Sequence, residues 1–345
     1  MFLGRTVRTE PPGQYLPLVD VDLIELPHYR SLREIRQFAR ASPATIWALW
    51  RALRHIDAVW VFGPHPFALV LVLLAAIRKK RVVLGVRQDT VAYFRGRLPS
   101  GRWSPVLLLA YALDASYRAL ASSVKTTVVG GEIARRYGDR ASVLPMTVSV
   151  VRAVDVVDSA PPRDWAGTID LLTVGRIEPE KNPLLLIEAL AALERQQPGR
   201  FRLTWLGDGQ LRESVWRRAV ELQVSHIVDL RGFIPFGPEL LGAYQSAHIF
   251  VHVSLTEGVP QVLMEAFASG TPVVATDVGG VRAALEDGGA GLLVPPSDSS
   301  AVVHAISALA DDTELRDRLV LRGLAIARAH TRETEAARVA RFIQA

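Results

Sequence analysis

Short apolar segments alternate with longer amphipathic segments along almost the whole chain, and this alternation constrains the possible folds most. Repeats of strand and helix favour parallel sheets with helices on both faces. We predict strands at residues 22–26, 58–62, 82–86, 126–129 and 142–144 in the first half, and at 169–174, 202–206, 227–230, 249–252 and 272–275 in the second. The expected fold class is therefore α/β, with two doubly wound, Rossmann-like domains.

The length of 345 residues suits two domains of ordinary size, each with its own apolar core. The Pro-rich, charged sequence around residues 156–166 predicts a linker. The expected domains are residues 1–155 and 167–320, followed by a helix at 321–345. Because ligands of open parallel sheets bind beyond the carboxyl ends of the strands, we expect a ligand in a cleft between the domains.

Composition excludes several classes of protein. The apolar fraction of 49% excludes a disordered or fibrous chain, and the absence of cysteine excludes disulfides and thiolate chemistry. We recognise no secretory signal. The most apolar run, 58–77, is interrupted by Gly63–Pro66, so it indicates a strand and a helix rather than a transmembrane span. A cytoplasmic protein is expected.

Charge is distributed unevenly between the two halves. Residues 1–160 contain 22 Lys+Arg against 12 Asp+Glu, a balance of +10, and the remainder contains 18 against 23, a balance of −5. A basic half suits an acidic acceptor or peripheral contact with the anionic inner face of a membrane. Nucleic acid is not expected as a partner, because no nucleic-acid-binding module is recognisable and the arginines are scattered.

The most informative segment is 254–274, "SLTEGVPQVLMEAFASGTPVV". It places Glu257 in the loop before a predicted helix and Glu265 within that helix, which Pro260 starts and Gly270 ends. A helix N-terminus favours anions, so the loop can hold a phosphate while the carboxylates accept hydrogen bonds from sugar hydroxyls. From the residues alone, two solvated glutamates or the paired carboxyl groups of a glycosidase are alternatives.

Four segments in unbroken order resemble the retaining, GT-B-fold glycosyltransferases of family GT4, also called group 1. They are "LLTVGRIEPEKNPLLLIEAL" (171–190), "LTWLGDGQLRESV" (203–215), "VDLRGFIP" (228–235) and "EGVPQVLMEAFASGTPVVATDVGG" (257–280). The resemblance covers about residues 167–310. It implies the GT-B fold, whose last helix crosses back to the first domain, and a hexosyltransferase-like enzyme. Such an enzyme moves a sugar from a nucleoside-diphosphate sugar to a hydroxyl of a saccharide or lipid-linked acceptor, in cell-surface polysaccharide or glycolipid synthesis.

The resemblance also implies roles for individual residues. Arg176 and Lys181 stabilise the departing diphosphate, Glu257 contacts the donor sugar, and Glu265 accepts the ribose hydroxyls. The other candidates for donor binding are Gly175, Gly207, Gly209, Phe233, Ile234, Gly258 and Val259. Without the resemblance, Arg176 and Lys181 are ordinary solvated residues, and the glycines at 207 and 209 are a structural turn.

Neither a metal nor a cofactor is expected. The histidines are dispersed without the spacing of metal ligands. Asp20 and Asp22 imitate the metal-binding Asp-x-Asp of a different glycosyltransferase fold, GT-A, but lie far from the other motifs, so we interpret the match as coincidence. Metal-independent transfer is the prediction.

The N-terminal region departs from the family. Members generally open with a strand and a Gly-rich loop, and residues 1–27 contain no recognisable unit of this kind. We therefore expect the first strand and loop to be missing, through truncation or loss. Candidates on the acceptor side are His65, Arg87 and Asp89, with helix capping as the alternative for His65 and Asp89. Two other functions stay open: a catalytically silent nucleotide-binding scaffold subunit, and a nucleotide-sugar epimerase of the same fold.

Overall fold

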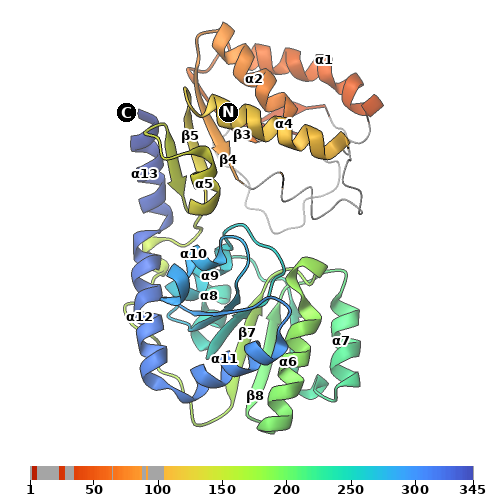
Figure 1. Ribbon diagram of the computed structural model, residues 1–345, viewed down its shortest axis with the longest axis vertical. Coiled ribbons are helices and arrows are strands. Elements are labelled where there is room, and N and C mark those ends of the chain that lie inside the picture. Colours follow the sequence, from red (N-terminus) through yellow and green to blue (C-terminus); the bar gives the residue numbers. More distant parts are fainter. Residues whose placement is uncertain are drawn as a thin grey trace. The chain divides into compact units, whose positions relative to one another are not determined.

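The computed structural model describes residues 2–5, 23–27, 35–63, 65–87, 91 and 105–344. The chain forms two compact units (Figure 1). The first comprises Met1–Val128 and Ile133–Leu144, and the second comprises Val129–Glu132 and Pro145–Ala345. Both units are α/β structures with parallel strands, as predicted.

The main sheet of the first unit has the strand order β3-β4-β5-β6. Its strands are β3 (Ala58–Gly63), β4 (Arg81–Val86), β5 (Lys125–Val129) and β6 (Val143–Met146), and its helices are α1 (Ile35–Ala52), α2 (Pro66–Ile77), α4 (Pro105–Leu120) and α5 (Gly131–Tyr137). Apolar side chains such as Leu53, Leu84 and Tyr117 form its core. The apolar run 58–77 is thus a strand followed by a helix, as predicted. Among the described residues, no helix is both long enough and apolar enough to cross a bilayer.

The expectation of a missing first strand is wrong. Strand β1 (Phe2–Arg5) pairs in parallel with β2 (Leu23–Leu26), with Phe2 opposite Leu23. A strand of four residues is enough when its backbone groups pair with a neighbour, and so short a strand leaves little periodicity in the sequence. The expected absence of the Gly-rich loop concerns residues 6–22, which lie outside the described residues.

The sheet of the second unit has the order β12-β11-β10-β7-β8-β9, and all its strand pairs are parallel. Its strands are β7 (Ile169–Val174), β8 (Phe201–Leu206), β9 (Val228–Gly232), β10 (Ile249–His252), β11 (Val273–Thr276) and β12 (Leu292–Val294). The chain proceeds outward from β7 to β9 and then returns to the other side of β7 with β10. This reversal creates a topological switch point between β7 and β10, where ligands of doubly wound sheets bind.

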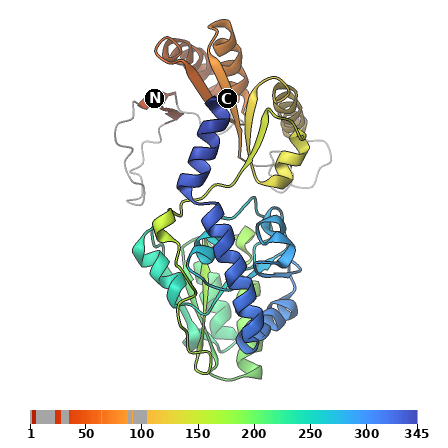
Figure 2. The same cartoon turned by 90° about the vertical axis from the view of Figure 1, so that its left-hand side faces the viewer.

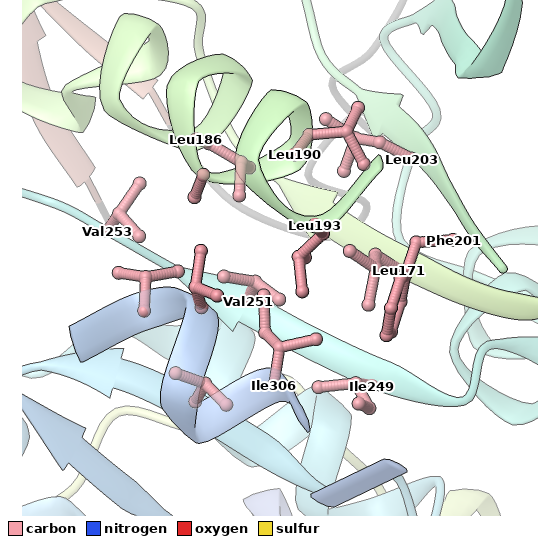
Figure 3. Close-up of a cluster of buried hydrophobic side chains, with 14 of the residues drawn as sticks. Leu171, Leu186, Leu190, Leu193, Phe201, Leu203, Ile249, Val251, Val253 and Ile306 are labelled. Atoms are coloured by element: carbon pink, nitrogen blue, oxygen red, sulfur yellow. The ribbon is translucent and has the colours of Figure 1, made fainter. Parts of the chain in front are cut away.

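Helices cover both faces of this sheet. One face carries α6 (Pro183–Gln196), α7 (Arg212–Glu221) and α11 (Ser299–Asp311), and the other carries α8 (Pro238–Ser246), α9 (Gln261–Ala268), α10 (Val281–Ala284) and α12 (Thr313–Ala329). Figure 3 shows Leu186, Leu190 and Leu193 of α6 directed toward Leu171 and Val251 of the sheet. Apolar residues spaced by three and four give α6 this buried face.

The second face is closed by α12, which is blue in Figure 2. A Cβ atom on Gly323 of α12 would lie 2.7 Å from Cδ1 of Phe267 in α9, so the glycine permits a close approach of the two helices. The last helix, α13 (Arg332–Gln344), also belongs to the second unit, where the N–H of Arg332 donates to the carbonyl of Val151 over 2.7 Å. The expected return of this helix to the first domain stays a prediction.

The segment predicted as a linker, 156–166, is packed against the second unit. The N–H of Val157 donates to the carbonyl of Ala268 over 2.9 Å, and the guanidinium of Arg163 donates to the carbonyl of Gly270 over 3.0 Å. Burial lowers the pKa of Arg163 to about 10, which leaves it charged at neutral pH. This segment therefore continues the fold of the second unit.

The core around α6 predicts a large contrast between two leucines of that helix. Leu190 is fully buried, whereas Leu184 is 38% exposed. Replacing Leu190 by Ala should lower the free energy of unfolding by about 2–5 kcal/mol, because it leaves a cavity. Leu184→Ala should cost less than about 1 kcal/mol. Urea denaturation of both variants measures the difference, and equal losses would contradict the observed packing.

Candidate functional site

The carboxyl ends of β7 and β10 carry two loops that meet at the switch point. Lys181 ends a short 3-10 helix (Pro179–Lys181) between β7 and α6, and Glu257 lies in the loop between β10 and α9. The ammonium Nζ of Lys181 is 2.5 Å from Oε1 of Glu257. Their side chains are only 21% and 11% exposed, so solvent screens this ion pair less than a surface pair. The pair joins the two loops across the switch point.

A second donor reaches the same carboxylate oxygen. His252, the last residue of β10, is buried, and its Nε2 lies 2.9 Å from Oε1 of Glu257. Burial lowers the pKa of His252 although Glu257 opposes this, so the imidazole is neutral at pH 7. Because an ionised carboxylate only accepts, Nε2 carries the hydrogen and donates it. The hydroxyl of Ser254 is 3.2 Å from the same nitrogen.

Glu257 therefore has one oxygen held and one oxygen available. Both donors meet Oε1, and Oε2 has no hydrogen-bond partner within the described part of the chain. Burial by itself would raise the pKa of Glu257, but the hydrogen bonds from His252 and Lys181 and the positive charge of Lys181 outweigh it and lower the pKa to about 2. The carboxylate is ionised at neutral pH, and Oε2 can accept a hydrogen bond from a ligand hydroxyl.

Glu265 occupies a different environment. It lies on α9 and is only 5% exposed, and the hydroxyl of Tyr244 on α8 donates to its Oε2 over 2.9 Å. Burial raises the pKa of Glu265, and the hydrogen bond from Tyr244 opposes that rise. Oε1 of Glu265 has no hydrogen-bond partner among the residues that the structure describes.

Arg176 lies in the loop after β7 but does not join the pair of Lys181 and Glu257. Its guanidinium contacts Oε1 of Glu180 at 2.8 Å, and its side chain is 67% exposed. Ion pairs at such exposure contribute about 0–1 kcal/mol, so the guanidinium can exchange Glu180 for another anion at little cost.

Gly207 and Gly209, two of the predicted donor-binding residues, allow a close approach between two loops. A Cβ atom on Gly207 would lie 1.9 Å from the carbonyl oxygen of Gly175, and one on Gly209 would lie 2.5 Å from that of Ile177. Side chains here would separate the loop after β8 from the loop after β7. Gly175, at φ +146°, and Gly207, at φ +153°, also adopt backbone conformations that favour glycine.

A second pair of glycines, Gly279 and Gly280, packs against the loop that carries Glu257. The N–H of Gly280 donates to the carbonyl of Gly258 over 2.8 Å, and a Cβ atom on Gly279 would lie 1.9 Å from the carbonyl oxygen of Glu257. The N–H groups of Gly258 and Val259 have no acceptor within the described residues. These two N–H groups therefore remain available to an anion.

Phe233 and Ile234 follow β9, at the edge of the sheet. Phe233 is 50% exposed, whereas Ile234 is partly buried and packs against the core that includes α8 and α9. Of these two candidates for donor binding, only Phe233 presents a large apolar surface to solvent.

The candidates on the acceptor side lie in the first unit. Nδ1 of His65 accepts the N–H of Phe67 over 3.2 Å and caps α2, which confirms the capping alternative. The guanidinium of Arg87 lies 5.4 Å from the centre of the Phe62 ring. Asp89, like Asp20 and Asp22, lies outside the described residues. Within the ranges described, no group of three His, Cys, Asp or Glu side chains could hold a metal ion.

The lowered pKa of Glu257 predicts an acid-dependent contribution to stability. A group whose pKa falls from 4.5 to about 2 on folding stabilises the protein fully above about pH 4.5 and progressively less as the pH drops toward 2. The difference in unfolding free energy between the native protein and Glu257→Gln should therefore shrink by up to about 3 kcal/mol over that range. Denaturant titrations across this pH range measure it.

The control is Glu213→Gln, which alters a side chain that is 89% exposed. This variant should match the native protein within about 0.5 kcal/mol at every pH. A pH-independent difference for Glu257→Gln would contradict the ion-pair geometry.

Part of the chain matches a known protein family. The model of the family described as "Glycosyl transferases group 1" matches residues 164–323. The D-inositol 3-phosphate glycosyltransferase of Nocardia farcinica is 37% identical over 172 residues, which are 46% of this chain and 38% of that protein. The lipopolysaccharide core biosynthesis glycosyltransferase LpsE of Rhizobium meliloti is 35% identical over 153 residues, 44% of this chain and 43% of LpsE. The chain thus matches less than half of either relative.

Solved structures extend the likeness to both units. The sucrose-phosphate synthase of Thermosynechococcus elongatus has a TM-score of 0.70 at 19% identity, covering 99% of this chain and 87% of that one. HepE of Anabaena, in complex with UDP and glucose, has a TM-score of 0.68 at 17% identity, covering 94% of this chain and 86% of that one. At these identities the likeness shows the fold, which is GT-B. The likeness to the group 1 glycosyl transferase family itself extends over residues 164–323.

Proposed function

We propose that the protein is a retaining glycosyltransferase that uses a nucleoside-diphosphate sugar and a saccharide or lipid-linked acceptor. The observation that carries this proposal is the contact of Lys181 and His252 with Glu257 at the switch point of a group 1 domain. The relatives named above supply the biological setting, in which sugar is added to inositol phosphate or to lipopolysaccharide core. Synthesis of a cell-surface polysaccharide or glycolipid is the corresponding role for this chain.

The proposed position of the diphosphate is the loop of Gly258 and Val259, whose N–H groups are available. Lys181 and Arg176 stand on the neighbouring loop. As the bond between sugar and phosphate breaks, negative charge grows on the diphosphate oxygens, and preorganised cations stabilise that charge. In a front-face displacement the same oxygens help to take the proton of the acceptor hydroxyl. We propose transfer without a metal or cofactor, because the two side chains supply the positive charge.

The two glutamates hold the rest of the donor in this proposal. Oε2 of Glu257 accepts a hydroxyl of the donor sugar, and Oε1 of Glu265 accepts a hydroxyl of the ribose. Each oxygen lacks another hydrogen-bond partner among the described residues. An ionised carboxylate with one fixed oxygen presents the other in a defined direction, which favours one orientation of the sugar.

A donor assay separates this function from the two alternatives. The purified protein is incubated with UDP-, GDP- or ADP-glucose, with and without saccharide and lipid-linked acceptors. A transferase yields a glycosylated acceptor of retained anomeric configuration, an epimerase converts the donor without acceptor, and a scaffold subunit binds nucleotide without turnover. Either of the last two results would overturn the proposal.

Lys181 should dominate the binding of the diphosphate. Lys181→Ala should weaken binding of the preferred nucleoside diphosphate by about 10- to 150-fold, the equivalent of ~1.5–3 kcal/mol for a charge-assisted hydrogen bond. Calorimetric titration of UDP, GDP and ADP measures the loss. Lys79→Ala, which removes an exposed lysine of the first unit, is the control and should bind as the native protein does. Equal affinities for both variants would contradict the assignment of Lys181.

We also propose peripheral contact with an anionic membrane through helix α1. Arg36, Arg40, Trp47 and Arg51 are exposed at spacings of three to four residues or their multiples, so they share one face of the helix. The helix contains no acidic residue. The ring of Trp47 is 61% exposed, and the guanidinium of Arg51 lies 5.3 Å from its centre. A face of arginines around a tryptophan suits the anionic headgroup region of a bilayer.

The membrane contact predicts salt-sensitive sedimentation with phosphatidylglycerol vesicles. The double variant Arg40→Ala/Arg51→Ala should reduce binding about 10-fold or more, at roughly 1 kcal/mol per arginine. The control variant Arg195→Ala/Arg318→Ala removes two exposed arginines of the second unit and should bind normally. Binding that resists high salt, or that falls equally in both variants, would contradict the role of α1.

A further inference from the structure

Contacts other than the hydrogen bond to Glu265 hold the side chain of Tyr244 in place. The residue is fully buried, and its ring lies 5.3 Å from that of Phe250 in β10. Its carbonyl accepts the hydroxyl of Thr271 over 2.7 Å. Tyr244 is thus held by its own helix α8, by β10 and by the turn between α9 and β11, so the position of its hydroxyl is set by the fold.

The hydroxyl of Tyr244 makes one hydrogen bond, to Oε2 of Glu265 at 2.9 Å. Glu265 lies on α9, a different helix, 21 residues later in the chain. Because the phenol is immobile, the bond fixes the rotation of the carboxylate and therefore the direction of its other oxygen, Oε1. A hydrogen bond to an ionised carboxylate in a buried site is among the stronger ones.

We propose that Tyr244 is a positioning residue of the nucleotide site, which orients Glu265 so that Oε1 accepts a ribose hydroxyl of the donor. This inference rests on the proposed function, since it takes the ribose as the ligand of Glu265. Tyr244 itself stays behind Glu265 and does not touch the nucleotide.

The same bond also influences the charge of Glu265. Burial raises the pKa of this carboxyl group, and the Tyr244 hydroxyl lowers it. No charged side chain from the packed elements α8, α12, β10 and β11 adds to these two influences. Removing the hydroxyl therefore raises the pKa further, so that less of Glu265 is ionised at a given pH and its ability to accept hydroxyls is lost at a higher pH.

The variant Tyr244→Phe tests both consequences. Calorimetry gives the Kd of the preferred nucleoside diphosphate, and of its 2′,3′-dideoxy analogue, at several pH values between about 5.5 and 8.5. At about pH 7 the variant should bind the ribonucleotide about 3- to 10-fold more weakly and the dideoxy analogue as the native protein does. The weakening should increase as the pH falls.

Two further variants serve as controls. Tyr137→Phe removes the hydroxyl of another buried tyrosine, one that has no hydrogen-bond partner among the described residues, and it should leave both affinities unchanged. Glu265→Gln should weaken binding of the ribonucleotide and leave binding of the dideoxy analogue unchanged, because an amide oxygen accepts a ribose hydroxyl less strongly than a carboxylate does. Thermal unfolding of each variant confirms that it is folded.

The outcomes distinguish the two proposals. Equal weakening of the ribonucleotide and the dideoxy analogue, or a loss that does not vary with pH, overturns the role of Tyr244 and leaves the proposed function standing. Failure of the native protein to bind any of UDP, GDP or ADP overturns both. Selective, pH-dependent weakening in Tyr244→Phe alone supports the positioning role.

Discussion

The ion pair between Lys181 and Glu257 is the contact on which the site depends. Its partners are 76 residues apart in the chain and meet only because the strand order reverses between β7 and β10. Removing two charges from water costs free energy, so an ion pair with little exposure to solvent needs further hydrogen bonds to its charged groups. His252 meets part of that need, since it donates to the same oxygen. Close glycine contacts in both loops then keep Lys181 and Glu257 at the distance that their ion pair requires.

Both glutamates of the site follow one pattern, although their environments differ. Each has one oxygen held by side-chain donors and one oxygen without a partner among the described residues. Lys181 and His252 lower the pKa of Glu257 and keep it ionised. Burial raises the pKa of Glu265, and the hydroxyl of Tyr244 opposes that rise. The fold thus places two carboxyl groups, whose pKa values are shifted in opposite directions, at the same edge of one sheet.

The strands and loops of this arrangement could be predicted from the sequence, because each is encoded by a few consecutive residues. The alternation of apolar segments predicted the sheets, and the spacing of Glu257 and Glu265 identified the loop and helix that carry them. Tyr244 escaped notice because its link to Glu265 joins two helices and leaves no local pattern. His252 left one signal, a polar residue at the end of the otherwise apolar strand "IFVH". Strand β1 was missed because four residues carry almost no periodicity.

The rate of donor turnover in a double-mutant cycle of Lys181→Ala and Glu257→Gln tests the central claim, that this pair acts as one unit on the sugar nucleotide. Residues that act together lose their effects non-additively. The double variant should therefore turn over UDP-, GDP- or ADP-glucose about as slowly as the slower single variant. Losses that multiply across the two substitutions, or full activity in either single variant, would contradict the claim.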